Sequence, residues 1–196
     1  MTGQKIYMIG IGGIGMSALA QLYISEGKSV SGSDREKSPT TKLLGSKGIR
    51  IFFEQKAENI PKNAELIVYS DAVWDDNPER IRVKELGIRE ISYFEALGEV
   101  SKGKYTIAVS GTHGKTTVTA ILAKILQDAG KSPTAIVGSL VKEFGLDTGS
   151  VGRTDLQRES VLGSNFVEGK SNLFVVEACE YKDHMLKLSP TIFVLT

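Results

Sequence analysis

Several residue types are scarce in this chain of 196 residues, and each scarcity excludes a class of protein. One cysteine, Cys179, cannot form an internal disulfide framework, so we expect a protein of the reducing cytoplasm. Five prolines are too few for a proline-rich linker. Neither sign of charge is in excess, because 24 lysines and arginines are balanced by 23 aspartates and glutamates. Nucleic-acid binding needs a surplus of cations on one face, so we expect no nucleic-acid partner.

Long hydrophobic runs are also missing, with one apparent exception near the N-terminus. Residues 6–25 carry no charge, and that length would permit a membrane segment or a signal peptide. Four glycines crowd the middle of this stretch, and only one positive charge, Lys5, lies close before it. We therefore expect neither membrane insertion nor secretion.

Glycine, in contrast, is abundant, with 21 residues, which indicates tight turns and close approach of the backbone to other groups. Short apolar runs alternate with helix-like segments, a pattern typical of an α/β fold with parallel strands. Strands are predicted over residues 5–10, 29–33, 50–53, 65–69, 105–110, 134–137, 172–178 and 191–196. Helices are predicted over residues 14–26, 40–46 and 77–86, from residue 92, and over residues 115–129. The last helix is expected to bury one face, made by Val118, Ile121, Leu122, Ile125, Leu126 and Ala129.

Residues 100–104 contain no apolar run and mark a predicted domain boundary. The first domain, residues 1–103, is expected to be a Rossmann-like unit with a parallel sheet. The second, residues 104–196, is expected to be a truncated P-loop α/β unit that binds ATP, because the chain stops at the end of an apolar strand. Residues 138–171 lack periodicity and suggest small hairpins or a flap near a ligand.

The first site motif follows the first predicted strand, where Gly10, Gly12 and Gly15 satisfy G-x-G-x-x-G. The glycines permit the turn, the approach of a diphosphate and close packing of helix on strand. The helix N-terminus then offers N–H groups to the anion. Asp34, at the end of the second strand, can accept hydrogen bonds from a ribose or a base edge. The motif alone predicts a diphosphate nucleotide, with NAD(P) as the default.

The second motif, residues 110–117, also connects a strand to a helix and contains Gly114-Lys115-Thr116. It is a variant P-loop, since Val109 stands where the strict form has its first glycine. ATP or GTP phosphates would be held by Gly111, Thr112, His113, Gly114, Lys115, Thr116 and Thr117. Glu177, at the end of an apolar strand, is expected to share Mg²⁺ with Thr116. Cys179 is expected to be a packed, inert thiol, and Tyr69 and Trp74 core or rim residues.

Two phosphate sites on one chain suggest that one domain holds a nucleotide-linked substrate and the other brings ATP. The sequence resembles the Mur ligases of peptidoglycan synthesis, which join amino acids to a UDP-sugar. The resemblance is carried by GIGGIGMS at residues 10–17, GSD at 32–34, YSDAV at 69–73, DNP at 76–78, GTHGKTT at 111–117 and EACEY at 177–181. Because the phosphate loop contains a histidine, His113, the sequence most resembles the family members that add L-alanine to UDP-N-acetylmuramate.

The resemblance implies functions for individual residues. The first domain would bind UDP rather than NAD. Near the diphosphate would lie Gly12, Gly13, Ile14, Gly15, Met16 and Ser17. Near the uridine would lie Asp34, Ser70 and Ala72. Lys115 and His113 would serve catalysis, and Thr116 and Glu177 would bind Mg²⁺.

The implied reaction activates the muramate carboxylate with ATP as an acyl phosphate, which the amine of L-alanine then attacks. Family members continue beyond the point where this sequence stops. We therefore expect the 196-residue chain to bind the UDP-sugar, to bind ATP weakly if at all, and to ligate nothing alone.

Three other interpretations stay open at this point. A recycling ligase that attaches a whole tripeptide to UDP-N-acetylmuramate would share these N-terminal motifs. An NAD(P)-binding regulatory module would share the first motif without ligation chemistry. A plain P-loop kinase would leave the first hundred residues unexplained. The oligomeric state is not predicted.

Overall fold

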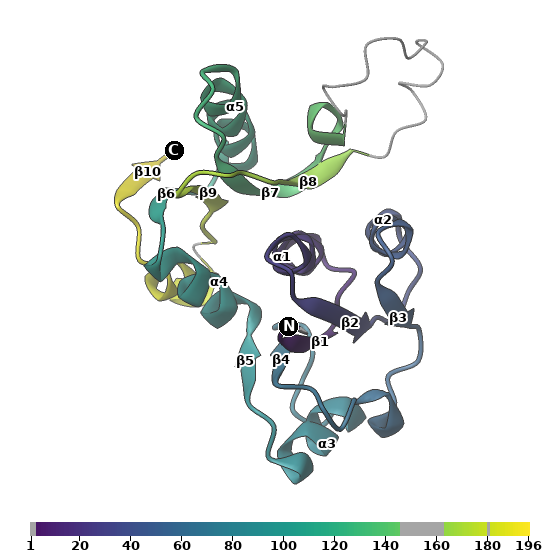
Figure 1. The fold of residues 1–196 in the computed structure, drawn as a ribbon. Coiled ribbons are helices and arrows are strands. Elements are labelled where there is room, and N and C mark those ends of the chain that lie inside the picture. The colour runs from purple at the N-terminus through teal and green to yellow at the C-terminus, as the bar shows by residue number, and fades with distance from the viewer. Residues whose placement is uncertain (1–2, 146–162, 180) are drawn as a thin grey trace. The chain divides into compact units, whose positions relative to one another are not determined.

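The computed structural model describes residues 3–145, 163–179 and 181–196, and it divides the chain into two compact units (Figure 1). The first unit is Met1–Glu99 and the second is Val100–Thr196. Among the described residues, none of the helices is both long enough and apolar enough to cross a membrane.

The first unit contains a five-stranded sheet in the order β3-β2-β1-β4-β5, and all its strand pairs are parallel. The strands are β1 (Lys5–Ile9), β2 (Ser29–Ser33), β3 (Arg50–Phe52), β4 (Leu66–Tyr69) and β5 (Glu90–Ser92). The helical segments are α1 (Ile14–Ser25), α2 (Pro39–Ser46), η1 (Ala57–Asn59) and α3 (Pro78–Leu86). Helix α4 (Tyr93–Lys102) contains the boundary between the two units. The strand order reverses between β1 and β4, because β2 and β3 lie on one side of β1 whereas β4 and β5 lie on the other. In parallel sheets, ligands bind at the strand carboxyl ends beside such a reversal.

Local sequence explains where the helices of the first unit begin and end. Helix α1 is apolar nearly all round, and every residue from Met16 to Tyr23 is buried, as its pattern predicts. Helix α3 begins at Asn77, whose side chain accepts a hydrogen bond from the Glu79 N–H, and it ends at Gly87 with φ +64°. The helix predicted from residue 92 begins with a capping box, in which Glu95 Oε2 accepts from Ser92 N at 2.9 Å.

Two tyrosines are buried in the first unit, Tyr7 on β1 and Tyr23 on α1. Burial raises the pKa of the Tyr7 hydroxyl, and the negative charge and hydrogen bond of Glu79 raise it further. Burial also raises the pKa of Tyr23, with smaller contributions from Glu99 and Glu26. Both hydroxyls therefore resist ionisation in the folded chain much more than in the unfolded chain.

This difference predicts a loss of stability at alkaline pH. Unfolded tyrosines ionise near pH 10, whereas the folded ones keep their protons, so the folded state binds more protons above that pH. The free energy of unfolding is expected to fall by up to about 1.4 kcal/mol per pH unit per tyrosine above about pH 10. Urea titrations between pH 8 and 11 measure this slope. The Tyr7→Phe variant should show a smaller slope, and an unchanged slope would contradict the assignment.

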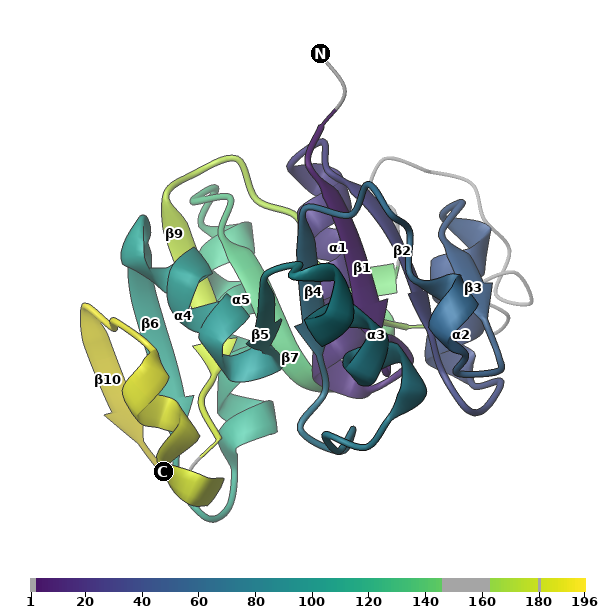
Figure 2. The same cartoon turned by 90° about the horizontal axis from the view of Figure 1, so that it is seen from below.

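The second unit contains a five-stranded sheet in the order β10-β6-β9-β7-β8 (Figure 2). Its strands are β6 (Tyr105–Ser110), β7 (Thr134–Val141), β8 (Ser164–Val167), β9 (Leu173–Glu177) and β10 (Ile192–Leu195). Its helical segments are α5 (Lys115–Asp128), η2 (Lys142–Gly145) and η3 (Tyr181–Lys187). The pairing of β7 with β8 is antiparallel, so the sheet is mixed. Strand β8 lies in the segment where no strand was predicted but small hairpins were suspected, so the antiparallel pair adds to the predicted α/β fold.

The β7–β8 pair occupies the two ends of the predicted hairpin or flap segment, residues 138–171. The ladder is irregular, with a register shift between Ile136 and Val141. The middle of the predicted flap, residues 146–162, lies outside the described residues.

The buried face predicted for α5 was wrong for Ile121, Ile125 and Ala129. Ile121 is 53% exposed and Ile125 is 58% exposed, whereas Thr119 and Ala123 are buried. Helix α5 therefore presents a neighbouring stripe to the sheet. Thr119 tolerates burial because its hydroxyl donates to Lys115 O at 2.8 Å. Leu122 and Leu126 are partly buried against the core cluster, while Val118 is half-buried and Ala129 is exposed.

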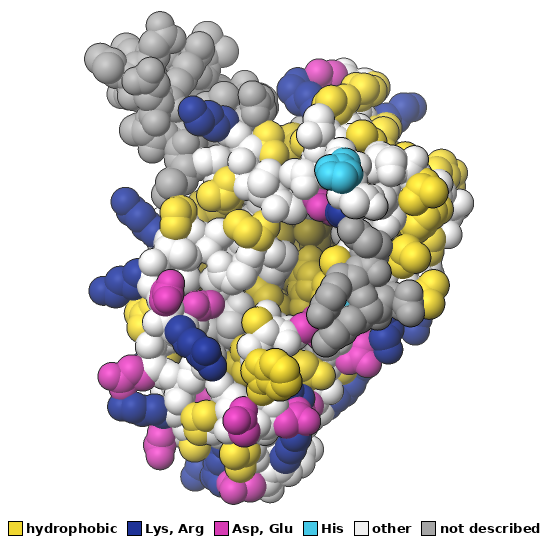
Figure 3. All heavy atoms as spheres, turned by 180° about the vertical axis from the view of Figure 1, so that it is seen from behind, with side chains coloured by type: hydrophobic (Ala, Val, Ile, Leu, Met, Phe, Trp, Pro, Cys, Tyr) yellow, Lys and Arg dark blue, Asp and Glu magenta, His cyan; other side chains and the backbone are white. Residues whose placement is uncertain are grey.

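The face of the molecule in Figure 3 carries basic, acidic and hydrophobic side chains side by side. Large exposed hydrophobic side chains of the second unit include Leu186 and Leu195 besides the two isoleucines of α5. In the first unit Trp74 is 76% exposed, so it is a surface residue and not part of the core.

Candidate nucleotide-binding site

The glycine turn of the first motif lies at the carboxyl end of β1. Gly10 has φ +81°, a conformation that glycine adopts without strain. The N–H groups of Gly10 and Ile11 both donate to Ser33 O, at 2.8 and 2.9 Å. The turn is therefore fixed to the end of β2, and α1 begins immediately after it.

The start of α1 is suited to an anion. Its N-cap is Gly13, no side chain caps it, and its first turn contains no acidic residue. The first N–H groups of a helix lack intrahelical acceptors and carry a partial positive charge. A diphosphate at this position would be stabilised by both effects.

Asp34 closes the other side of the turn. Its Oδ2 accepts from Gly12 N at 2.7 Å and its Oδ1 accepts from Glu36 N at 3.2 Å. The carboxylate is thus held by two backbone groups, and each oxygen retains a further lone pair for a ligand hydroxyl. The Gly12 N–H, in contrast, already has an acceptor.

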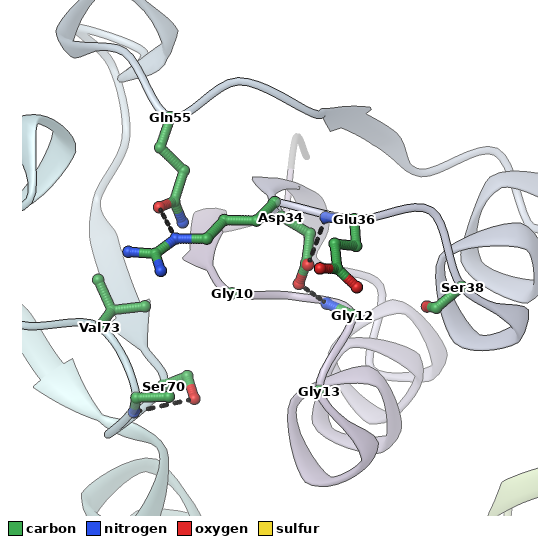
Figure 4. A pocket seen from close by; sticks show the side chains of 11 residues that line it. Gly10, Gly12, Gly13, Asp34, Glu36, Ser38, Gln55, Ser70 and Val73 are labelled. Carbon is green, nitrogen blue, oxygen red and sulfur yellow. Dashed lines mark hydrogen bonds between the residues drawn. The ribbon is translucent and has the colours of Figure 1, made fainter.

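A cavity of about 380 Å³ opens between these elements (Figure 4). It contains five of the predicted substrate residues: Gly12, Gly13, Asp34, Ser70 and Ala72. The other residues that line it are Gly10, Arg35, Glu36, Ser38, Gln55 and Val73.

Four predicted substrate residues do not line this cavity: Ile14, Gly15, Met16 and Ser17. The Met16 and Ser17 side chains are buried, and the Ser17 hydroxyl donates to Ile14 O at 2.8 Å. Any contact of these two residues with a diphosphate would have to use backbone N–H groups. Ile14 is partly exposed at the start of the helix.

Arg35, Glu36, Ser38, Gln55 and Val73 line the cavity and were not predicted from the sequence. Arg35 and Glu36 follow Asp34 directly in the sequence, so their position beside a predicted site residue could have indicated that they line the cavity. Gln55 has no such signal, because it lies in the loop after β3 and reaches the cavity only through the sheet order.

Gly15 is required by packing rather than by its backbone angles. A Cβ atom there would lie 2.4 Å from the ring of Tyr93, and ordinary carbon contacts are longer than 3.4 Å. The Gly15→Ala variant is expected to lower the free energy of unfolding by about 1–3 kcal/mol. Urea denaturation measures the loss.

Gly45 provides the matched control for this prediction. It lies inside α2, and a Cβ atom there would meet no atom within 4 Å. The Gly45→Ala variant should therefore stabilise the chain by about 0.5–1 kcal/mol. Equal effects of the two substitutions would contradict the packing argument.

The second motif forms a tight loop between β6 and α5. Gly111 has φ +132° and Gly114, the N-cap of α5, has φ +81°. No side chain caps this helix and its first turn contains no acidic residue. The Thr112, His113, Gly114 and Thr117 positions are exposed. The loop has the geometry that phosphate-binding loops use at a helix N-terminus.

Lys115 is half-buried at the start of α5, and its Nζ donates to Gly111 O at 2.5 Å. The ammonium group therefore lies over the loop that would hold phosphates. The His113 carbonyl accepts from the Thr196 hydroxyl at 2.5 Å. No described contact assigns a function to the His113 ring.

Thr116 and Glu177 are brought together by the sheet order. Strands β6 and β9 are adjacent and parallel, with Val109 opposite Glu177. The Thr116 hydroxyl donates to Glu177 Oε2 at 2.9 Å, and the same oxygen accepts from Gly138 N at 2.9 Å. A hydroxyl and a carboxylate are oxygen ligands of the kind Mg²⁺ prefers, so these residues fit the predicted ion. Among the described residues, no group of three or more His, Cys, Asp or Glu side chains could hold a metal.

Comparison with known proteins follows the same division of the chain. Residues 5–105 match "Mur ligase family, catalytic domain", and residues 109–196 match "Mur ligase middle domain". The UDP-N-acetylmuramate–L-alanine ligase of Clostridium kluyveri is 41% identical over 196 residues, which is 100% of this chain and 39% of that protein. That of Clostridium botulinum (strain Okra) is 43% identical over 98% of this chain and 38% of that protein.

Solved structures of ligases also match nearly the whole chain. The UDP-N-acetylmuramate–alanine ligase of Thermotoga maritima matches with a TM-score of 0.84 and 32% identity, over 97% of this chain and 40% of that one. A ligase of Neisseria meningitides for UDP-N-acetylmuramate and L-alanyl-γ-D-glutamyl-meso-diaminopimelate matches with a TM-score of 0.79 and 27% identity, over 98% and 60%. The chain spans about two fifths of the length of the curated relatives named here. With both of its units matched, the chain belongs to the Mur ligase family.

Proposed function

We propose that this chain supplies the UDP-sugar site and part of the ATP site of a cytoplasmic ligase that joins L-alanine to UDP-N-acetylmuramate. The observation that carries the proposal is the presence of two uncapped, glycine-led helix N-termini, at α1 and α5, in one member of this family. Relatives 41–43% identical to this chain are named for that reaction.

In the first unit, the proposed ligand is the UDP moiety rather than NAD. The N-terminus of α1 would bind the diphosphate, and Asp34, Ser70 and Ala72 would lie near the uridine. The cavity beside these residues supports this assignment, because a nucleotide needs a concave site with a few convergent polar groups.

In the second unit, residues 111–117 would bind the phosphates of ATP. Lys115 would contact the phosphate oxygens from the start of α5. Thr116 and Glu177 would hold Mg²⁺, and the ion when bound would neutralise charge on the phosphates. The 2.9 Å contact between the Thr116 hydroxyl and Glu177 supports this pairing.

The chemistry explains why a cation is needed at this point. A carboxylate is a poor electrophile, so ATP would convert the muramate carboxylate to an acyl phosphate before the amine of alanine attacks. Carboxylate and triphosphate are both anions and repel one another. Lys115 would offset that repulsion and stabilise the charge that moves on the γ-phosphate.

The test uses the full-length protein that contains this sequence. Phosphate release is expected only when ATP, Mg²⁺, UDP-N-acetylmuramate and L-alanine are all present, and mass spectrometry should detect the alanylated product. Omission of each component in turn is the control. Phosphate release that does not depend on L-alanine would contradict the proposal.

A recycling ligase that uses a tripeptide in place of alanine is the second candidate. The likeness to the Neisseria structure, at 27% identity, favours it, although the alanine ligases named here are more similar. Replacement of L-alanine by the tripeptide in the same assay separates the two functions. An NAD(P)-binding module is separated by titration with NADH, which is expected to give no response.

A further inference from the structure

Gly138 lies in β7, beside the carboxyl end of β9, and belongs to none of the family motifs quoted above. Residues 134–136 of β7 pair with residues 174–176 of β9 in a parallel ladder, which stops before Gly138. The pairing of β7 with β8 shifts its register over the same stretch, between Ile136 and Val141. Glycine inside a strand often marks such an irregularity or the close approach of another group.

The group that approaches Gly138 is the carboxylate of Glu177. The Gly138 N–H donates to Glu177 Oε2 at 2.9 Å. A Cβ atom at Gly138 would lie 2.3 Å from this oxygen and 2.7 Å from the carboxyl carbon, and ordinary carbon contacts are longer than 3.4 Å. Gly138 does not have a positive φ, so space rather than backbone conformation requires glycine here.

Two donors share one carboxylate oxygen and leave the other for a cation. The Thr116 hydroxyl donates to the same Oε2 at 2.9 Å. Glu177 Oε1 makes no hydrogen bond within the described part of the chain. A carboxylate only accepts, so the Thr116 proton points toward Glu177 and the lone pairs of the hydroxyl oxygen stay available.

We propose that Gly138 is a positioning residue for the divalent cation, acting through Glu177. Its N–H holds Oε2, and its missing side chain leaves the room in which the carboxylate lies beside Thr116. Groups that hydrogen-bond to a metal ligand fix its orientation, and their loss typically lowers metal affinity by about tenfold to a hundredfold. This inference rests on the proposed function of Thr116 and Glu177 as the Mg²⁺ residues.

The experiment uses the full-length protein and measures its affinity for a non-hydrolysable ATP analogue by calorimetry, once with Mg²⁺ and once with EDTA. The ratio of the two affinities, the magnesium ratio, reports what the cation contributes and involves no turnover. Gly138→Ala is expected to lower the magnesium ratio by about tenfold or more, because the new methyl group displaces the carboxylate. The affinity with EDTA should change by less than about threefold, since the N-terminus of α5 is unaltered.

Gly169→Ala is the matched control, because it introduces an equally close contact elsewhere in the same unit. Gly169 lies between β8 and β9, and a Cβ atom there would lie 2.2 Å from the backbone carbonyl carbon of Pro133, which directly precedes β7. Both residues are therefore at the amino ends of β7 and β9, away from Glu177. Gly169→Ala should destabilise the unit but leave the magnesium ratio unchanged, and thermal melts show which variants are folded in the assay.

A second substitution tests whether Gly138 acts through Glu177. Aspartate is shorter by one methylene, so Glu177→Asp withdraws the carboxylate from the Cβ atom of an alanine at position 138. The double variant Gly138→Ala/Glu177→Asp should therefore melt at a higher temperature than Gly138→Ala alone. In the Glu177→Asp background, Gly138→Ala should lower the magnesium ratio by less than about twofold, because two residues in contact are not independent.

The outcomes are distinguishable. A magnesium ratio that Gly138→Ala retains, or that Gly169→Ala lowers equally, would overturn this inference and leave the proposed function standing. A double variant less stable than Gly138→Ala would also overturn it. If Mg²⁺ did not strengthen binding of the analogue to the unsubstituted protein, the proposed function of Thr116 and Glu177 would fail, and the inference with it.

Discussion

The Lys115→Met variant of the full-length protein is expected to lose about a hundredfold to a thousandfold of its ligase activity. Methionine preserves most of the length and packing of the side chain but removes the positive charge. That charge lies at the start of α5, within 2.5 Å of Gly111 O, where the phosphates are proposed to bind. Release of phosphate at saturating substrates measures the loss.

Lys124 provides the matched control on the same helix. It is exposed and pairs with Asp128 one turn later, away from the phosphate loop. Surface ion pairs of this kind contribute little, so Lys124→Met should keep activity within about twofold. Thermal melts of both variants check that neither has unfolded. A Lys115→Met enzyme with more than a tenth of the original activity would contradict the proposed function of this lysine.

Backbone features were the most predictable part of the fold. The glycines of both loops have the turn geometry that their spacing implied, since Gly10, Gly111 and Gly114 have positive φ. Helix limits were equally predictable where a cap could be seen, as with Asn77 before α3. These features depend on a few neighbouring residues, which the sequence displays directly.

Features that depend on distant segments were less predictable. The apolar positions of α5 did not reveal which stripe packs on the sheet, because Thr119 is buried and Ile121 is not. The antiparallel pairing of β8 with β7 also escaped, because the local pattern of a short strand does not fix its direction. The proximity of Thr116 to Glu177 could be predicted, because the parallel strands β6 and β9 end at the same edge of the sheet.

The cavity illustrates the same limit. Asp34 could be predicted to line the cavity, because it ends the strand that follows the glycine turn in the sequence. Gln55 could not, because its position depends on the order of β3, β2 and β1 and its amide orientation depends on Asn77. The hydrogen bonds that join Arg35, Gln55 and Asn77 connect separate loops, and no repeating pattern in the sequence indicates such contacts.

The burial of Glu79 on α3 could not be predicted from the sequence. Glutamate in the first turn of a helix is normally exposed and stabilises the helix dipole. Here the side chain is fully buried. Its carboxylate accepts from Tyr7 Oη at 2.8 Å, from Asn59 Nδ2 at 2.8 Å, and from the Ser33 hydroxyl. Three donors from β1, β2 and η1 thus replace the water that it loses.

The Glu79→Ala variant is expected to lower the free energy of unfolding by about 3–5 kcal/mol, since it leaves the buried hydroxyls of Tyr7 and Ser33 without an acceptor. Asn59 Nδ2 would keep its hydrogen bond to Glu54 O. Glu79→Gln should lose less, about 1–2 kcal/mol, because the two hydroxyls can turn to accept from the new amide. Urea denaturation measures both losses. Circular dichroism and the single tryptophan, Trp74, which lies in the same unit, report the transition.

Glu85 on the same helix is the control, because it is exposed and pairs only with Arg82 among the described contacts. Glu85→Ala should change stability by less than about 0.5 kcal/mol. If Glu79→Ala cost no more than Glu85→Ala, the buried network would contribute nothing to the fold. The expected loss also bears on the cavity, because Ser33 holds the glycine turn through its carbonyl while its hydroxyl donates to Glu79. Nucleotide binding by Glu79→Ala should therefore weaken even under conditions where the chain stays folded.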